Sequence, residues 1–328
     1  MIIQIDGFYI DDSFSLSPLV GRMTLAQLQY LDALDTHRHF GEAAAACGVT
    51  QPTLSTQVRR LEEELGLTLI DRGRQPVVPT AAGERIVAQA RNVLAARDRL
   101  QTLAGDVQDR ITGTLRIGLL PTLSPYLLPL VVPAMESAYP EATLVVREWP
   151  TTDLLEALRT DTLDAALIAT EEAQPDIREQ VLFSEPFVGY VAPSHRLAPR
   201  ETLESTDLSL DDLWLLSEGH CFRDQVLQVC GAAPSTPQSA VQFESGSLET
   251  LIHLVRHTGG MTLLPALATH HMSADARSTY VTPFAAPPPS RQVRLVRRRS
   301  HKQRLLDAFV DTLIDTLPDT VSPAGSPR

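Results

Sequence analysis

The chain has 328 residues, of which 43% are hydrophobic and 21% are charged, and its formal net charge is −12. This length predicts two or three globular domains, and no apolar run reaches the roughly 18 residues that a membrane helix needs. The negative charge excludes a protein that binds nucleic acid over its whole surface, although a local basic face could still do so. Three cysteines without a secretory signal argue against a secreted disulfide scaffold and indicate the reducing cytoplasm.

The first predicted domain spans residues 23–80. We expect the preceding residues 1–22 to be either a disordered leader or an artefact of the choice of start site. A first helix is indicated by apolar residues at helical spacing, namely Leu25, Leu28, Leu31 and Leu34. A second helical pattern covers residues 40–46, and Cys47, just after it, is interpreted as a small packing residue rather than a sensor.

A turn and a third helix follow. Gly48 can form the turn, Thr50 can cap the helix, and Pro52 suits a first helical turn, where a missing N–H costs nothing. Together with the preceding helices, this pattern is typical of a helix-turn-helix. Small polar groups and arginines suit phosphates and base edges, whereas the alternative is an ordinary solvated face. The candidate DNA-binding residues of this segment are Gln51, Pro52, Thr53, Ser55, Thr56, Gln57, Arg59 and Arg60.

Residues 69–79 predict a short hairpin, or wing, with Arg72 and Arg74 at its tip as candidates for phosphate contacts. A linker of residues 81–112 follows, and its helical pattern extends to about Val107. Such an isolated amphipathic helix needs a partner, and we expect the same helix of a second subunit. The alternative is packing within its own subunit. The apolar line consists of Ile86, Ala90, Val93, Leu100 and Leu103.

From residue 113 to 318 the pattern changes to alternating strands and helices, which indicates an α/β domain with largely parallel sheets. We predict two lobes, one of residues 113–187 and 291–318 and the other of residues 188–290. The Pro/Ser/Gly-rich tail, residues 319–328, is expected to be loose. The predicted strands are 115–120, 143–147, 165–169, 187–191 and 291–297, and the predicted helices are 126–138, 153–159 and 305–317.

Two of the three cysteines, Cys221 and Cys230, lie nine residues apart beside His220, Arg223 and Asp224. Histidine and arginine charges, and the N-terminus of a helix, favour a thiolate, so Cys221 is the candidate nucleophile. On a continuous helix the two cysteines are separated by roughly 13–14 Å of rise, whereas a disulfide needs Cα atoms about 4.4–6.8 Å apart. A disulfide between them would therefore require the helix to be remodelled. The alternative is two inert core cysteines, because free cysteines are often buried.

Residues 40–66 resemble the DNA-reading domain of LysR-type transcription regulators. Residues 215–225 with Cys230, and residues 247–251 and 260–268, are similar to the peroxide-sensing members of that family. The resemblance implies an α+α/β fold: an N-terminal winged helix-turn-helix, a long linker helix, and a two-lobed α/β effector domain like the periplasmic binding proteins.

The resemblance also implies a site. Cys221 would attack peroxide and then form a reversible disulfide with Cys230. Thr122, Thr151 and Arg291 align with polar groups of the family's peroxide pocket, beside His220, Arg223 and Asp224. The sequence departs from the family's pattern at Trp149-Pro150, which leaves the shape of the pocket open.

The implied partners are double-stranded promoter DNA, hydrogen peroxide, a second copy in a homodimer or homotetramer, RNA polymerase, and a glutaredoxin or thioredoxin as reductant. We expect no cofactor, no metal, no membrane association and no enzymatic activity. His253 and His257 have helical spacing but no further ligand beside them. Two alternatives stay open: a LysR-type regulator that senses a metabolite, and a thiol peroxidase.

Overall fold

The computed structural model of the chain describes residues 23–107, 110–172, 175–231, 247–298 and 304–324, with only the backbone for residues 99 and 101–107. It forms two compact units, divided between Arg97 and Asp98, and each is described by itself. The predicted leader lies outside the described residues. Within the described part, no helix is long and apolar enough to cross a membrane.

The first unit contains the predicted helix-turn-helix. Thr24 begins the first helix with a capping box, in which Gln27 returns the hydrogen bond. Thr50 caps the third helix, which has a proline in its first turn as predicted, and Gly66 ends it at a left-handed φ of 64°. The three helices are α1 (Leu25–His37), α2 (Phe40–Ala46) and α3 (Gln51–Leu65).

The wing is a pair of short antiparallel strands, β1 (Ile70–Asp71) and β2 (Val78–Pro79). It is fastened to α3 by Glu62, whose Oε1 accepts hydrogen bonds from the backbone N–H groups of Leu69 (2.8 Å) and Ile70 (3.1 Å). Helix α3 and the wing therefore share one buried carboxylate.

Helix α4 (Ala81–Val107) ends where the sequence predicts. Its predicted apolar line is wrong in part, because Ala90 packs into the core of the helix-turn-helix together with Val87 and Leu94. Val93 and Leu100 remain exposed, at 42% and 68%. One apolar face of the helix thus packs against its own subunit, whereas Val93 and Leu100 on another face are exposed.

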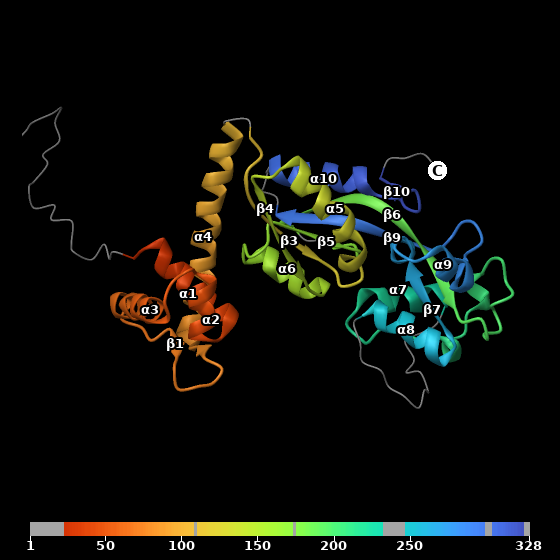
Figure 1. The fold of residues 1–328 in the computed structure, drawn as a ribbon, viewed down its shortest axis with the longest axis horizontal. Helices are drawn as coiled ribbons and strands as arrows, with labels where there is room; N and C mark the ends of the chain where they lie inside the picture. Colours follow the sequence, from red (N-terminus) through yellow and green to blue (C-terminus); the bar gives the residue numbers. More distant parts are fainter. Residues whose placement is uncertain (1–22, 108–109, 173–174, 232–246, 299–303, 325–328) are drawn as a thin grey trace, which may run out of the picture. The chain divides into compact units, whose positions relative to one another are not determined.

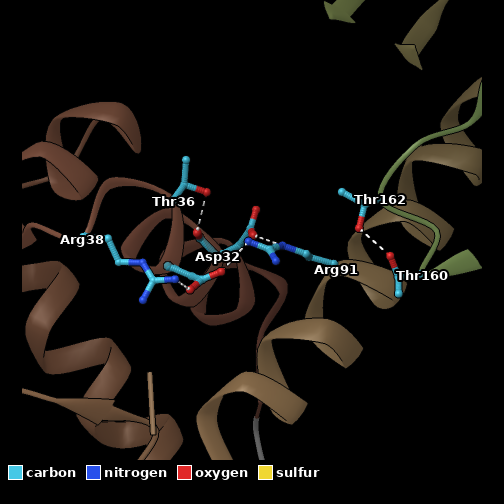
Figure 2. Close-up of polar contacts among 7 residues, drawn as sticks. Asp32, Thr36, Arg38, Arg91, Thr160 and Thr162 are labelled. Atoms are coloured by element: carbon cyan, nitrogen blue, oxygen red, sulfur yellow. Dashed lines mark hydrogen bonds and ion pairs between the residues drawn. The ribbon is translucent and has the colours of Figure 1, made fainter. Parts of the chain in front are cut away.

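Arg91 fastens α4 to α1. Figure 2 shows its side chain directed toward Asp32, to which Nε donates at 2.6 Å, while Nη2 donates to Asp35 at 2.7 Å. Asp35 also pairs with Arg38 at 2.7 Å. Two carboxylates and two guanidiniums fix the N-terminal part of the linker helix on the reader domain.

The second unit contains two lobes (Figure 1). In the first, helices α5 and α10 pack against each other on one face of a sheet, and α6 lies on the other face. Its elements are β3 (Gly113–Leu119), α5 (Ser124–Ala138), β4 (Ala142–Glu148), α6 (Thr151–Arg159), β5 (Ala165–Ile168), β6 (Ile177–Val191), β9 (Ser290–Arg298), α10 (Arg304–Thr316) and β10 (Ser322–Pro323).

The prediction of largely parallel sheets is wrong. The strand order is β10-β6-β9-β5-β3-β4, and only the pairs that β3 makes with β4 and β5 are parallel. The alternation of strand and helix stops after β5. Strands β6 and β9 then carry the chain out of the first lobe and back, so they run in opposite directions and pair antiparallel.

The second lobe is built on the last part of β6. The pairing of β6 changes at Phe187, from which it pairs with β7 and β8, and this lies one residue before the predicted border. The elements of this lobe are the short 3-10 turns Ser205–Asp207, Leu210–Asp212 and Ala266–Thr269, helices α7 (Cys221–Val229), α8 (Leu248–Thr258) and α9 (Ala274–Tyr280), and strands β7 (Met261–Pro265) and β8 (Val281–Pro283).

The prediction of a loose tail is wrong for residues 319–324. Strand β10 pairs with β6, the Ala324 N–H donates to the carbonyl of Leu182 at 2.8 Å, and Val321 is buried. Residues 325–328 lie outside the described part. The tail thus adds an edge strand to the first lobe.

Candidate functional site

Helix α7 begins at Cys221 and has Cys230 as its C-terminal cap, so the segment between the two cysteines is helical. Gly219, at a φ of 88°, turns the chain into it, and His220 is the residue before its first turn. The described structure contains both thiols as free cysteines. Over nine residues the helix separates them by roughly 13–14 Å of rise, well beyond disulfide reach.

Cys221 lies in a small pocket between the two lobes. Loop residues after β3 and before α6 face the start of α7 across it. The cavity volume is about 10 Å³, room for about one molecule of the size of water. The pocket is lined by Leu120, Pro121, Thr122, Pro150, Thr151, Gly219, His220, Cys221 and Phe222.

Arg291 lies behind this lining rather than in it. Its Nη1 donates to Thr122 Oγ1 and its Nη2 to the Thr122 carbonyl, both at 3.0 Å. The guanidinium carbon is 5.3 Å from the centroid of the Phe222 ring. Arg291 therefore acts on the pocket through its charge and through Thr122, as a fixed group in the interior.

The environment of the thiol corrects one expectation. Burial raises the pKa of Cys221, opposed by the charge of Arg291, the Thr151 hydroxyl and the Phe222 N–H, which all favour the thiolate. The Thr151 hydroxyl is itself buried without a partner in hydrogen-bond geometry. It is near enough to favour the thiolate without forming a regular hydrogen bond.

Two further predicted pocket residues, besides Arg291, do not line the pocket. Arg223 turns back along the chain, where Nη1 donates to the carbonyl of Leu216 at 2.8 Å. Asp224 is exposed, and its charge raises the pKa of Cys221. The cation that acts on the thiol is Arg291, because the helix directs Arg223 away from the site. Thr122, Thr151 and His220 do line it.

Cys230, at the other end of α7, is half-buried, and burial raises its pKa to about 11. At neutral pH it is therefore a thiol in the folded state. Cys47 caps α2 and packs against the reader core, and burial raises its pKa too. No cluster of three or more possible metal ligands occurs within the described residues.

The reader helix α3 presents most of its predicted contact residues to solvent: Gln51, Pro52, Thr53, Thr56, Arg59 and Arg60. Ser55 and Gln57 are half-buried. Gln57 Oε1 accepts from Gln27 Nε2 of α1 at 3.4 Å, a bond that does not use the NH₂ group of Gln57. Thr53 shares a hydroxyl contact of 2.8 Å with Thr50.

The two wing arginines differ. Arg72 donates to Glu62 at 2.7 Å and stacks over the ring of Phe40 at 5.9 Å, so its guanidinium already has a structural partner. The Arg74 side chain is 72% exposed and pairs with the partly exposed Asp71 at 3.2 Å. The sequence made Arg72 and Arg74 equal candidates for a phosphate contact. In the structure Arg74 is the stronger candidate, because Arg72 already has a partner.

Sequence reasoning missed two residues of the site. Glu185 forms a buried ion pair with Arg291, and Gln225 of α7 donates to the carbonyl of Ala169 at 2.7 Å. Both contacts join segments more than 50 residues apart. No local pattern marks them, and only the strand register could have predicted the first.

Two family models match the chain. The helix-turn-helix of the lysR family of bacterial regulatory proteins matches residues 25–84, and the LysR substrate binding domain matches residues 108–318. The chain belongs to the LysR family. It is a transcription regulator rather than an enzyme.

Within this family, the chain is similar to OxyR proteins. The DNA-binding transcriptional dual regulator OxyR of Escherichia coli K12 is 38% identical over 88% of this chain and 95% of its own length. The hydrogen peroxide-inducible genes activator of Haemophilus influenzae is also 38% identical, over 84% and 91%.

Solved structures agree with this placement. A full-length cysteine-to-aspartate variant of OxyR from Pseudomonas aeruginosa has a TM-score of 0.68 at 35% identity, covering 93% of this chain and 99% of that one. A cysteine-to-serine variant of Corynebacterium glutamicum OxyR with bound hydrogen peroxide has a TM-score of 0.60 at 31% identity, covering 90% and 92%. The expected winged helix-turn-helix and two-lobed effector domain are thus confirmed.

Proposed function

We propose that this LysR-family regulator senses hydrogen peroxide through Cys221 and answers by forming a Cys221–Cys230 disulfide. One observation carries the proposal: a thiol at the first residue of a helix, in a pocket with room for roughly one small molecule, with a second thiol at the far end of that helix. The similarity to hydrogen peroxide-inducible genes activators supports the same conclusion.

The first step is nucleophilic. The Cys221 thiolate attacks one peroxide oxygen, an S–O bond forms, the O–O bond breaks, and the departing hydroxide takes a proton to become water. Thr122, Thr151 and His220 line the pocket, and in this proposal their hydroxyl and ring groups form hydrogen bonds with the two oxygens. The product is a sulfenic acid on Cys221.

The second step needs α7 to unwind. Cys230 then attacks the Cys221 sulfur, the S–S bond forms, and the hydroxyl leaves as water. Phe222, Val226 and Leu227 of α7 are buried in the core, so unwinding must repack both lobes around them. We expect that repacking to change how subunits meet and hence how the reader domains are spaced on DNA.

The partners follow from this role. α3 and Arg74 bind double-stranded promoter DNA as an oligomer, and the regulator acts on RNA polymerase. A glutaredoxin or thioredoxin restores the thiols, which suits the cytoplasm. A metabolite at this pocket is disfavoured by its volume, and a thiol peroxidase would turn over repeatedly with a reductant.

The test combines peptide mapping with DNA binding before and after micromolar peroxide. Cys221→Ser should abolish the response. Cys230→Ser should stop at the sulfenic acid, and Cys47→Ser, the matched control, should respond as the unmodified chain does. A normal response from Cys221→Ser would refute the proposal.

A further inference from the structure

Beneath the pocket lies a buried ion pair between the two strands that connect the lobes. Glu185 of β6 and Arg291 of β9 are directly opposite in the antiparallel register, and both side chains are 0% exposed. Burying two charges is costly, and a well-packed apolar pair of similar volume often serves stability as well or better. The position of this pair next to the reactive thiol therefore calls for a role besides stability.

Both carboxylate oxygens of Glu185 accept hydrogen bonds. Oε2 accepts from Arg291 Nε and lies 2.8 Å from both Nε and Nη2. Oε1 accepts from the Leu267 N–H at 2.9 Å, at the start of the turn after β7. The carboxylate therefore fixes one edge of the planar guanidinium and is itself fixed by the second lobe.

The opposite side of the guanidinium orients Thr122. Arg291 donates both to the hydroxyl and to the carbonyl of this residue. Since Oγ1 accepts from Arg291, the hydroxyl hydrogen is directed elsewhere, and Thr122 lines the pocket. The chain of contacts thus runs from Glu185 through Arg291 to Thr122, a residue that lines the pocket.

We propose that Glu185 is a positioning residue for the reaction of Cys221 with peroxide: its buried carboxylate holds Arg291, and through it Thr122, in the orientation that the pocket requires. This inference rests on the proposed function. Glu185 is not one of the residues that line the pocket, and it acts through Arg291, whose charge favours the Cys221 thiolate.

The same two strands provide a matched control. Glu179 of β6 pairs with Arg294 of β9 at 3.3 Å, and both side chains are largely buried, at 17% and 16% exposure. Neither residue lines the pocket. Glu179→Gln therefore removes a comparable cross-strand ion pair without disturbing Thr122, and it measures the purely structural effect.

The experiment uses the full chain carrying Cys230→Ser, so that oxidation stops at Cys221. The rate of sulfenic acid formation with hydrogen peroxide is measured for Glu185→Ala, Glu185→Gln and Glu179→Gln, and the pH dependence of iodoacetamide alkylation reports the Cys221 pKa. Circular dichroism and thermal melts confirm folding. Should Glu185→Ala not fold, Glu185→Gln, which keeps the size of the side chain, carries the test.

We expect the Glu185 variants to react with peroxide roughly tenfold to hundredfold more slowly, since misplacing a catalytic group by about 1 Å has effects of that size. Their alkylation profile should shift to higher pH. Arg291→Lys, which keeps the charge but loses the planar fork, should also slow the peroxide reaction. Glu179→Gln should match the parent.

Two results would overturn the inference: Glu185 variants that react like Glu179→Gln, or variants that react faster with a lower Cys221 pKa. The second result would mean that Arg291 keeps its place unaided and that Glu185 only neutralises it. If the parent chain itself forms no sulfenic acid with peroxide, the proposed function fails instead, so the two failures are distinguishable.

Discussion

Glu62 provides the sharpest test of how the reader domain is held together. Its carboxylate accepts from the N–H groups of Leu69 and Ile70, two residues that are 0% and 1% exposed, and it pairs with Arg72. In Glu62→Ala both N–H groups lose their acceptor inside the protein. The wing would then have nothing to fasten it to the recognition helix except apolar packing.

The expected loss can be worked from these contacts. A buried donor without a partner costs about 1–3 kcal/mol, so two cost roughly 2–6 kcal/mol, and the partly exposed Arg72 pair adds at most about 1 kcal/mol. Allowing water to reach the vacated space, we expect the free energy of unfolding of the reader unit to fall by about 3 kcal/mol. For a domain of this size that corresponds to a Tm lowered by roughly 10–20 °C.

The assay is thermal unfolding of the full chain, with hydrogen exchange followed by mass spectrometry on peptides that cover the wing. Exchange at the N–H groups of Leu69 and Ile70 should accelerate well beyond that of α1. Glu63→Ala is the matched control, because Glu63 is the exposed neighbour on the same helix. If both variants unfold at the same temperature, Glu62 does not hold the wing and the reasoning is refuted.

Three further predictions concern assembly, packing and pH. Leu100→Glu should yield folded monomers in sedimentation, because Leu100 is 68% exposed. Val87→Glu should instead unfold the reader unit, because Val87 is buried. Intact oligomers of the Leu100 variant would mean that α4 does not mediate assembly. Gly83→Ala should lower the Tm, because an added Cβ would lie 1.9 Å from the Leu69 carbonyl oxygen; an unchanged Tm would show that the backbone can yield there. Burial raises the pKa of Cys230 to about 11, so the rate at which this thiol is alkylated in the native reduced chain should keep rising with pH up to that value. In urea the midpoint of the alkylation profile should fall to about 8.5. Equal midpoints in the two conditions would contradict the burial argument.

The sequence predicts best those features that depend on neighbouring residues. Helical periodicity and capping residues located α1, α2 and α3, and Thr50 caps α3 as expected. The end of α4 at Val107 follows from the loss of the same periodicity. A continuous helix between Cys221 and Cys230, which the spacing argument considered, is present as α7.

Features that depend on distant segments were not predictable in this way. The Glu185–Arg291 pair exists only because β6 and β9 run antiparallel in one register, over a separation of 106 residues. Arg72 looked free in the sequence because Glu62, ten residues earlier, gives no sign that it turns toward the wing. The sign of the Cys221 pKa shift was missed because flanking cations are visible in a sequence, whereas burial is not.

The contacts of helix α7 explain both why the reduced state is stable and how it would respond to oxidation. Its first residue is Cys221, the proposed reactive thiol, and its length keeps Cys230 beyond disulfide reach. Its apolar face, with Phe222 and Val226 buried, and the hydrogen bond from Gln225 to the Ala169 carbonyl fasten it to the core. These contacts oppose the unwinding that a disulfide requires, so thiols alone do not close the bridge. A sulfenic acid on Cys221 changes the balance, because a favourable S–S bond then becomes available to offset the lost packing. Reduction removes that bond, and the same contacts restore the helix.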